Sequence, residues 1–160
     1  MTPFVLQCGN PLLPITLTDV PLRNADAVPT DDDCSAIFSD IESAPEPRII
    51  VLGDDASLAA LLTRLMRTER LHVEVAFVPE NATDAAHIYK LGTGSRAAKV
   101  ALTGTASSTP LIRDDAGKAV VGRALLGGAD GTDLEGEAYV DDTRLFSGVD
   151  RKSTRLNSSH

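Results

Sequence analysis

The clearest pattern in the chain is a pair of short apolar runs separated by an amphipathic stretch. Residues 48–52 form a run rich in β-branched side chains that ends at a glycine, which is typical of a buried strand. Between residues 54 and 70, leucines recur every three or four positions and predict a helix, with Asp54 or Asp55 as its N-cap. A second strand is expected at residues 73–78. Strand, helix and strand in this order predict a parallel βαβ unit.

Two shorter helices and a change of period follow this unit. The first helix is expected from Thr83 or Asp84 to about residue 91, and the second runs from Ser95 to about residue 102. From Pro110 onwards, short apolar segments alternate with turn residues, which predicts antiparallel hairpins. We therefore expect an α/β fold. It has a short parallel βαβ core at about residues 48–103, followed by an antiparallel β portion that is incomplete at its C-terminal end.

The remaining segments complete a division of the chain into four parts. Residues 1–47 are expected to be an extended or β segment with an acidic loop, because prolines interrupt the apolar runs. An acidic triplet, Asp31 to Asp33, is interpreted as solvated loop in preference to a metal site. The α/β core is assigned to residues 48–109 and the antiparallel portion to residues 110–149.

Residues 150–160, DRKSTRLNSSH, have an origin of a different kind. This peptide resembles the in-frame translation of a common short-read sequencing adapter, so we expect it to be an artefact and exclude it from inferences about fold. The alternative interpretation is a natural polar tail. Two consequences follow from treating the peptide as an artefact. Its basic residues are not read as a basic patch, and the antiparallel portion is expected to be truncated after Val149.

The composition of the chain excludes some classes of protein function. The chain has 160 residues, a formal net charge of −8, and only two cysteines, in no zinc or redox motif. An acidic chain without clustered lysine and arginine does not suit the nucleic-acid backbone, and no apolar run is long enough to span a membrane. These features predict a cytoplasmic protein that binds no nucleic acid. Self-association through the antiparallel portion remains an open expectation.

Two glycine-containing turns are the candidate binding sites. Gly53 lies between a predicted strand and a helix start, and Gly92-Thr93-Gly94 lies between two predicted helices. Such turns present backbone N–H groups and the positive end of a helix dipole, which suit a phosphate group. The alternative interpretations are an ordinary capped helix start at Gly53 and a simple inter-helix turn at residues 92–94.

The two turns together resemble motifs of the diacylglycerol kinase and NAD kinase superfamily. That family pairs a Gly-Gly-Asp-Gly-Thr-Leu loop with a later Pro-Leu-Gly-Thr-Gly-Asn loop, followed by a β-sandwich. Asp55, Ser57 and Leu58 match the first motif, and residues 91–94 match the second. The resemblance covers residues 48–149 and extends to actinobacterial proteins of the same plan.

This chain also departs from both motifs at five positions. Asp54 and Ala56 replace glycines of the first motif. Around the second, Lys90, Ser95 and Arg96 replace a proline, an asparagine and an acidic residue. The resemblance therefore implies a degenerate kinase-like domain in which phosphotransferase activity is lost or altered.

The resemblance also implies roles for individual residues. Backbone amides around Gly53, Gly92 and Gly94 would hold nucleotide phosphates, Ser57 and Thr93 would donate hydrogen bonds, and Asp55 would hold Mg²⁺. ATP and Mg²⁺ are thus cofactors only through the resemblance, and neither a catalytic residue nor a resident metal is assigned. The alternative is a non-catalytic binding or regulatory domain.

Overall fold

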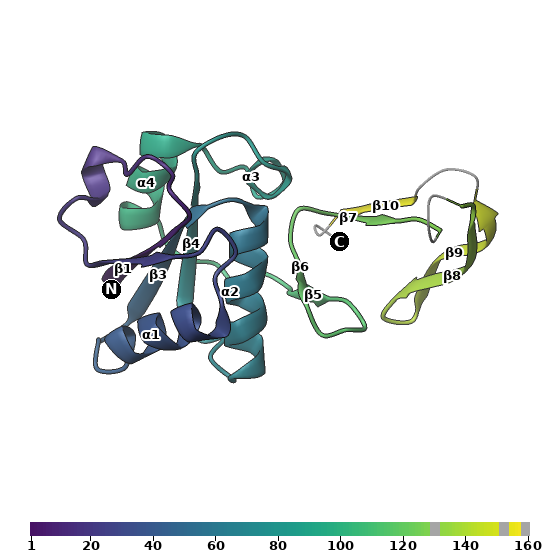
Figure 1. Ribbon diagram of the computed structural model, residues 1–160, viewed down its shortest axis with the longest axis horizontal. Coiled ribbons are helices and arrows are strands. Elements are labelled where there is room, and N and C mark those ends of the chain that lie inside the picture. Colours follow the sequence, from purple (N-terminus) through teal and green to yellow (C-terminus); the bar gives the residue numbers. More distant parts are fainter. Residues whose placement is uncertain (129–131, 151–153, 158–160) are drawn as a thin grey trace.

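A computed structural model describes residues 1–128, 132–150 and 154–157 of the chain. Its centre is a four-stranded parallel sheet (Figure 1). In spatial order β2-β1-β3-β4, the strands are β2 (Leu22–Ala25), β1 (Thr2–Cys8), β3 (Pro47–Gly53) and β4 (Glu74–Pro79). The α/β fold class and the parallel βαβ unit predicted from the sequence are confirmed.

Helices cover both faces of the sheet and make three layers. On one face lie α1 (Asp31–Ile41) and α2 (Asp55–Arg67), and on the other lie the 3₁₀ helix η1 (Ile15–Leu17) and α4 (Gly94–Thr103). The short helix α3 (Asp84–Ile88) follows β4. Side chains of β3 alternate between the layers because successive residues of a strand point to opposite faces. Ile49 and Val51 pack with α1 and α2, whereas Ile50 and Leu52 pack with α4.

Residues 1–47 supply two strands, which agrees with the expected β segment, and they add a helix and an interior strand position that the sequence did not predict. β1 is an interior strand, hydrogen-bonded to β2 on one side and to β3 on the other. Pro3 fits there because the ladder with β2 begins only at Val5, so the strand is open on that side at the proline. Half of the parallel sheet therefore comes from the N-terminal segment.

The acidic triplet is also not a loop: it forms the first turn of α1. Thr30 and Asp33 make a capping box, in which the Asp33 amide donates to the Thr30 hydroxyl and the Thr30 amide donates to the Asp33 carboxylate. Carboxylates in a first turn are favourable because the N-terminus of a helix is the positive end of its dipole. The buried side chains of α1 recur at helical spacing, at residues 34, 37, 38 and 41.

Beyond residue 110 the chain forms antiparallel pairs beside the α/β body (Figure 1). The strands are β5 (Ile112–Arg113), β6 (Ala119–Val120), β7 (Arg123–Leu126), β8 (Leu134–Val140), β9 (Thr143–Asp150) and β10 (Thr154–Asn157). β5 pairs with β6, β8 with β9, and β7 with β10. The predicted change to antiparallel structure is therefore confirmed. Outside the described residues lie positions 129–131, 151–153 and 158–160, and the last two ranges are the larger part of the adapter-like peptide.

Candidate functional site

The Gly53 turn connects the end of β3 to the start of α2. Asp54 is the N-cap of α2, and its carboxylate accepts a hydrogen bond from the Ser57 amide at 2.9 Å. The Ser57 side chain is fully buried, and its hydroxyl donates to the Asp54 carbonyl at 2.7 Å. A methyl group on residue 53 would collide with the Ser57 hydroxyl and lie 3.0 Å from the Cys8 Cβ. Both Gly53 and Ser57 are thus engaged in internal packing.

Asp55 joins the start of α2 to the start of α3. Its Oδ2 accepts a hydrogen bond from the Ala85 amide at 3.1 Å. Its Oδ1 is buried and has no hydrogen-bond partner among the described residues. Gly122, which has a φ of +68°, approaches from the β6–β7 connection, where an added Cβ would lie 3.0 Å from Oδ2 of Asp55. Asp55 therefore lies inside a junction of three segments.

The Gly92-Thr93-Gly94 turn opens α4. Thr93 is the N-cap residue, but its side chain makes no capping hydrogen bond, unlike Thr30, Asp54 and Thr83 at the other α-helices. Gly94 has a φ of +49° and open space where a side chain would be. The first amides of a helix have no acceptor within it, so this start of α4 offers unsatisfied N–H donors.

A groove lies beside this turn, between α3 and α4, with a volume of about 520 Å³. We call it the α3–α4 groove. Its polar lining consists of His87, Lys90 and Arg96. Its remaining walls are Gly92 and the apolar side chains of Ala86, Leu91 and Val100. Lys90 and Arg96 are two of the positions at which the sequence departs from the kinase motif, so motif matching alone gave no reason to place them in a site.

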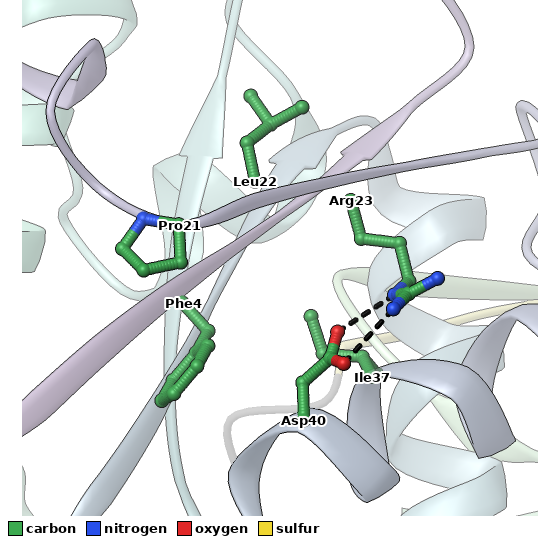
Figure 2. Close-up of a pocket in the computed structure, with 6 residues that line it drawn as sticks. All are labelled: Phe4, Pro21, Leu22, Arg23, Ile37 and Asp40. Atoms are coloured by element: carbon green, nitrogen blue, oxygen red, sulfur yellow. Dashed lines mark hydrogen bonds and ion pairs between the residues drawn. The ribbon is translucent and has the colours of Figure 1, made fainter.

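A second hollow, of about 310 Å³, lies between β2 and α1 (Figure 2). Arg23 and Asp40 form a bidentate ion pair across it, in which Nε of Arg23 donates to Oδ2 of Asp40 at 2.7 Å and Nη2 donates to Oδ1 at 2.9 Å. The hydrogen bond from Arg23 lowers the pKa of the Asp40 carboxyl from its ordinary value. Because these charged groups already satisfy each other, a ligand here would have to break their ion pair.

The two cysteines are buried in the core between the sheet and the helices α1 and α2. Burial raises the pKa of the Cys8 thiol to about 12 and that of Cys34 to about 11. A thiol is nucleophilic and binds metals only as the thiolate. These groups therefore suit packing and not covalent chemistry.

The residues expected to bind phosphate fall into two sets. Gly53, Asp55 and Ser57 surround the start of α2, whereas Gly92, Thr93 and Gly94 surround the start of α4. The α3 helix connects them, since its Ala85 amide bonds to Asp55 while Ala86 and His87 line the groove beside Gly92. In the parts of the chain that the structure describes, no group of three His, Cys, Asp or Glu side chains is placed to hold a metal ion.

Within the same residues, no helix has both the length and the apolar character needed to cross a membrane. Compared with models of protein families, with curated proteins and with solved structures, the chain matches none of them.

Proposed function

We propose that this chain is a divergent kinase-like α/β domain that binds the phosphate groups of a nucleotide at the carboxyl edge of its parallel sheet. The observation that carries the proposal is that both glycine turns open helices at this edge. The Gly53 turn directly follows the carboxyl end of β3. The far end of α4 lies at the opposite edge, because Arg48, near the start of β3, donates to the carbonyls of Ala101 and Gly104. Open parallel sheets bind ligands at the carboxyl ends of their strands.

The two turns contribute differently to this proposal. At the start of α2, the Asp54 side chain caps the helix and the Ser57 hydroxyl is bonded to the backbone, so few donors remain for a ligand. At the start of α4, Thr93 makes no side-chain cap. The helix dipole there also favours an anion. We therefore assign phosphate binding to residues 92–94 and a structural role to Gly53 and Ser57.

The surroundings of Asp55 do not fit a resident Mg²⁺ site. One carboxylate oxygen is bonded to Ala85, the other is enclosed, and no cluster of three potential ligands exists among the described residues. Mg²⁺ is commonly held by one or two carboxylates together with substrate phosphates. Any Mg²⁺ would accordingly enter bound to the nucleotide, and we assign it no role in a reaction.

Calorimetric titration of the full chain with ATP, with and without Mg²⁺, tests this function. We expect saturable heat at millimolar or lower ATP and none with adenosine, because the proposed contacts are to phosphate. An absence of heat with ATP under both conditions would remove the nucleotide-binding function.

A non-catalytic, self-associating domain is the second candidate, and the antiparallel portion favours it. Leu125, Tyr139, Leu145 and Val149 are large apolar side chains that are 42–63% exposed on β7, β8 and β9. Association that covered these side chains would be favourable, because it would remove apolar surface from water. Light scattering should then show a mass that rises with concentration and falls when Leu125 and Val149 are replaced by serine. A monomer at every concentration would contradict this candidate.

A further inference from the structure

The α3–α4 groove is lined by basic side chains that have no partner among the described residues. Five arginines form ion pairs with carboxylates, namely Arg23, Arg48, Arg64, Arg123 and Arg144. Arg67 and Arg70 donate to backbone carbonyls. The side chains of Arg96 and Lys90 make no hydrogen bond or ion pair with a described residue, although acidic residues outnumber Lys and Arg by 23 to 15. The side chains of Lys99, Arg113 and Lys118 also have no described partner, but none of them lines the groove.

Within the described parts of the chain no carboxylate lines this groove, which is a local departure from the acidic charge of the whole sequence. His87, Lys90 and Arg96 are all exposed and line one hollow, and its other walls are glycine and apolar side chains. Grouped cations without counter-charges repel one another and lower the stability of the fold. A bound anion would reverse this effect, because charge-assisted hydrogen bonds to an anion are stronger than neutral ones.

The apolar half of the groove narrows the class of ligand. Val100 is 51% exposed and lies one helical turn beyond Arg96, and Leu91 and Ala86 complete the apolar wall. A volume of about 520 Å³ lies within the range of small-molecule sites. The site can therefore hold more than a bare inorganic anion.

We propose that the α3–α4 groove binds a phosphorylated small molecule that carries an apolar or aromatic group. Lys90, Arg96 and His87 contact the phosphoryl oxygens, and Leu91 and Val100 contact the apolar group. The inference deepens the proposed function, because it places ligand contacts at side chains outside the glycine turns. Phosphoryl groups of this kind occur both in nucleotides and in lipid headgroups, so the shared chemistry is the claim.

Calorimetry with three probes and two matched pairs of substitutions tests this inference on the full chain. The probes are inorganic pyrophosphate, ATP and a short-chain phosphatidic acid below its micelle-forming concentration. The groove variant is Lys90→Gln with Arg96→Gln. The control variant is Lys99→Gln with Arg113→Gln, which makes the same charge change at exposed positions that do not line the groove.

We expect the groove variant to weaken binding of every probe by about tenfold or more and the control variant by less than about twofold. If the two variants weakened probe binding equally, the groove would not be the binding site, because the loss would be explained by the change in overall charge. If ATP bound the wild type and the groove variant equally, the proposed function would stand and this inference would fall. Lack of binding by all three probes would overturn both.

The apolar part of the proposal has a separate test. ATP or the phosphatidic acid should bind more tightly than pyrophosphate, and Val100→Ser should reduce that advantage while leaving pyrophosphate affinity unchanged. Which of the two organic probes binds more tightly decides between a nucleotide and a lipid source. Pyrophosphate binding as tightly as both organic probes would overturn the assignment of an apolar group.

Discussion

At the scale of single residues, position 53 was predicted to contact a ligand, but the packing around it is what requires a glycine. The family resemblance implies that backbone amides around Gly53 hold a phosphate, but in the structure the space beside this glycine is filled by Ser57 and Cys8. The backbone of Gly53 has no positive φ, so the requirement is for space and not for an unusual conformation.

Gly53→Ala should therefore destabilise the fold by about 1–3 kcal/mol, because an added methyl overpacks a buried contact. Urea unfolding measures the change. Gly127→Ala is the matched control, since nothing lies within 4 Å of its added Cβ, and it should change stability by less than about 0.5 kcal/mol.

Adding Ser57→Ala to Gly53→Ala gives a second check, because it removes the hydroxyl that collides with the new methyl. The two substitutions together should cost less than the sum of their separate costs. Strictly additive costs would contradict the steric explanation.

The buried thiols give a prediction about alkaline pH. Cys8 and Cys34 have pKa values raised from 9.0 to about 12 and about 11, so the unfolded chain loses these protons before the folded chain does. Their contribution to stability is complete below pH 9 and is lost as the pH rises towards 11 and 12. Unfolding free energies measured between pH 8 and about pH 11 should fall more steeply for the wild type than for the Cys8→Ala/Cys34→Ala variant. Equal slopes of unfolding free energy against pH for the two proteins would contradict this prediction.

The same residue scale explains what the sequence missed in the site. Lys90 and Arg96 differ from the family motifs, and His87 has no metal-ligand spacing, so each was unremarkable along the chain. Only the folded arrangement of residues 86–100 brings the three into one groove. The available signal was the pair Lys90 and Arg96, with His87 nearby, in an otherwise acidic chain.

At the scale of elements, α1 and α4 differ in how their first turns are capped. The first turn of α1 is closed by the reciprocal hydrogen bonds of Thr30 and Asp33, whereas Thr93 leaves the start of α4 uncapped by a side chain. The first backbone amides of a helix have no acceptor within the helix and donate to side chains, water or ligands instead. The difference supports a structural role for the start of α1 and a binding role for the start of α4.

Thr30→Ala should cost about 1 kcal/mol of stability, whereas Thr93→Ala should cost only a few tenths, because only the first removes a capping hydrogen bond. Chemical denaturation of the two variants measures the difference. The hydrogen bonds from Thr30 lower the pKa of Asp33 below its ordinary value of 3.8. The backbone amide of residue 30, the larger cause, remains in Thr30→Ala, and only the hydrogen bond from the hydroxyl is lost. The stabilisation from that hydroxyl is present above pH 3.8 and is lost as the pH falls, so the deficit of Thr30→Ala should narrow slightly in acid. Equal costs for both threonines would contradict the assignment.

α1 itself could have been predicted from the chain. Cys34, Ile37, Phe38 and Ile41 have helical spacing, and Thr30 with Asp33 satisfies the pattern of an acidic capping box. The run of three aspartates favoured a loop because such runs are usually solvated. Here they are solvated on the outer face of a helix, whose inner face packs on the sheet.

At the scale of the whole molecule, the chain divides into a parallel body with two cores and an antiparallel portion whose described residues form no core of their own. Four consecutive residues of β3, Ile49 to Leu52, are fully buried between the two helical layers. Along β8 no residue is buried. An isolated two-stranded hairpin is at best marginally stable in water.

Hydrogen exchange of the full chain, followed by mass spectrometry, should reflect this division. Amides of β3 should exchange most slowly, since their exposure requires global unfolding, and amides of β8 and β9 should exchange rapidly by local opening. If self-association covers the hairpin, its protection should rise with protein concentration. Strong protection of β8 and β9 in a dilute monomer would contradict the expectation.

The sequence by itself determined the local elements of the central region. The apolar run ending at Gly53, the leucine spacing of α2 and the turn residues of the antiparallel portion each encode their structure within a few positions. Such patterns are local, because strand and helix periods and turn conformations depend on neighbouring residues.

Only the tertiary structure decided the strand order, the interior position of β1 and the α3–α4 groove. The strand order and the position of β1 depend on contacts between distant segments, which a local pattern does not specify. The groove depends on how two helices that follow each other in the chain are placed in space. The hydrogen bonds from Arg48 to the end of α4 join residues more than fifty positions apart. The placement of both glycine turns at one edge of the sheet is therefore a property of the packed molecule.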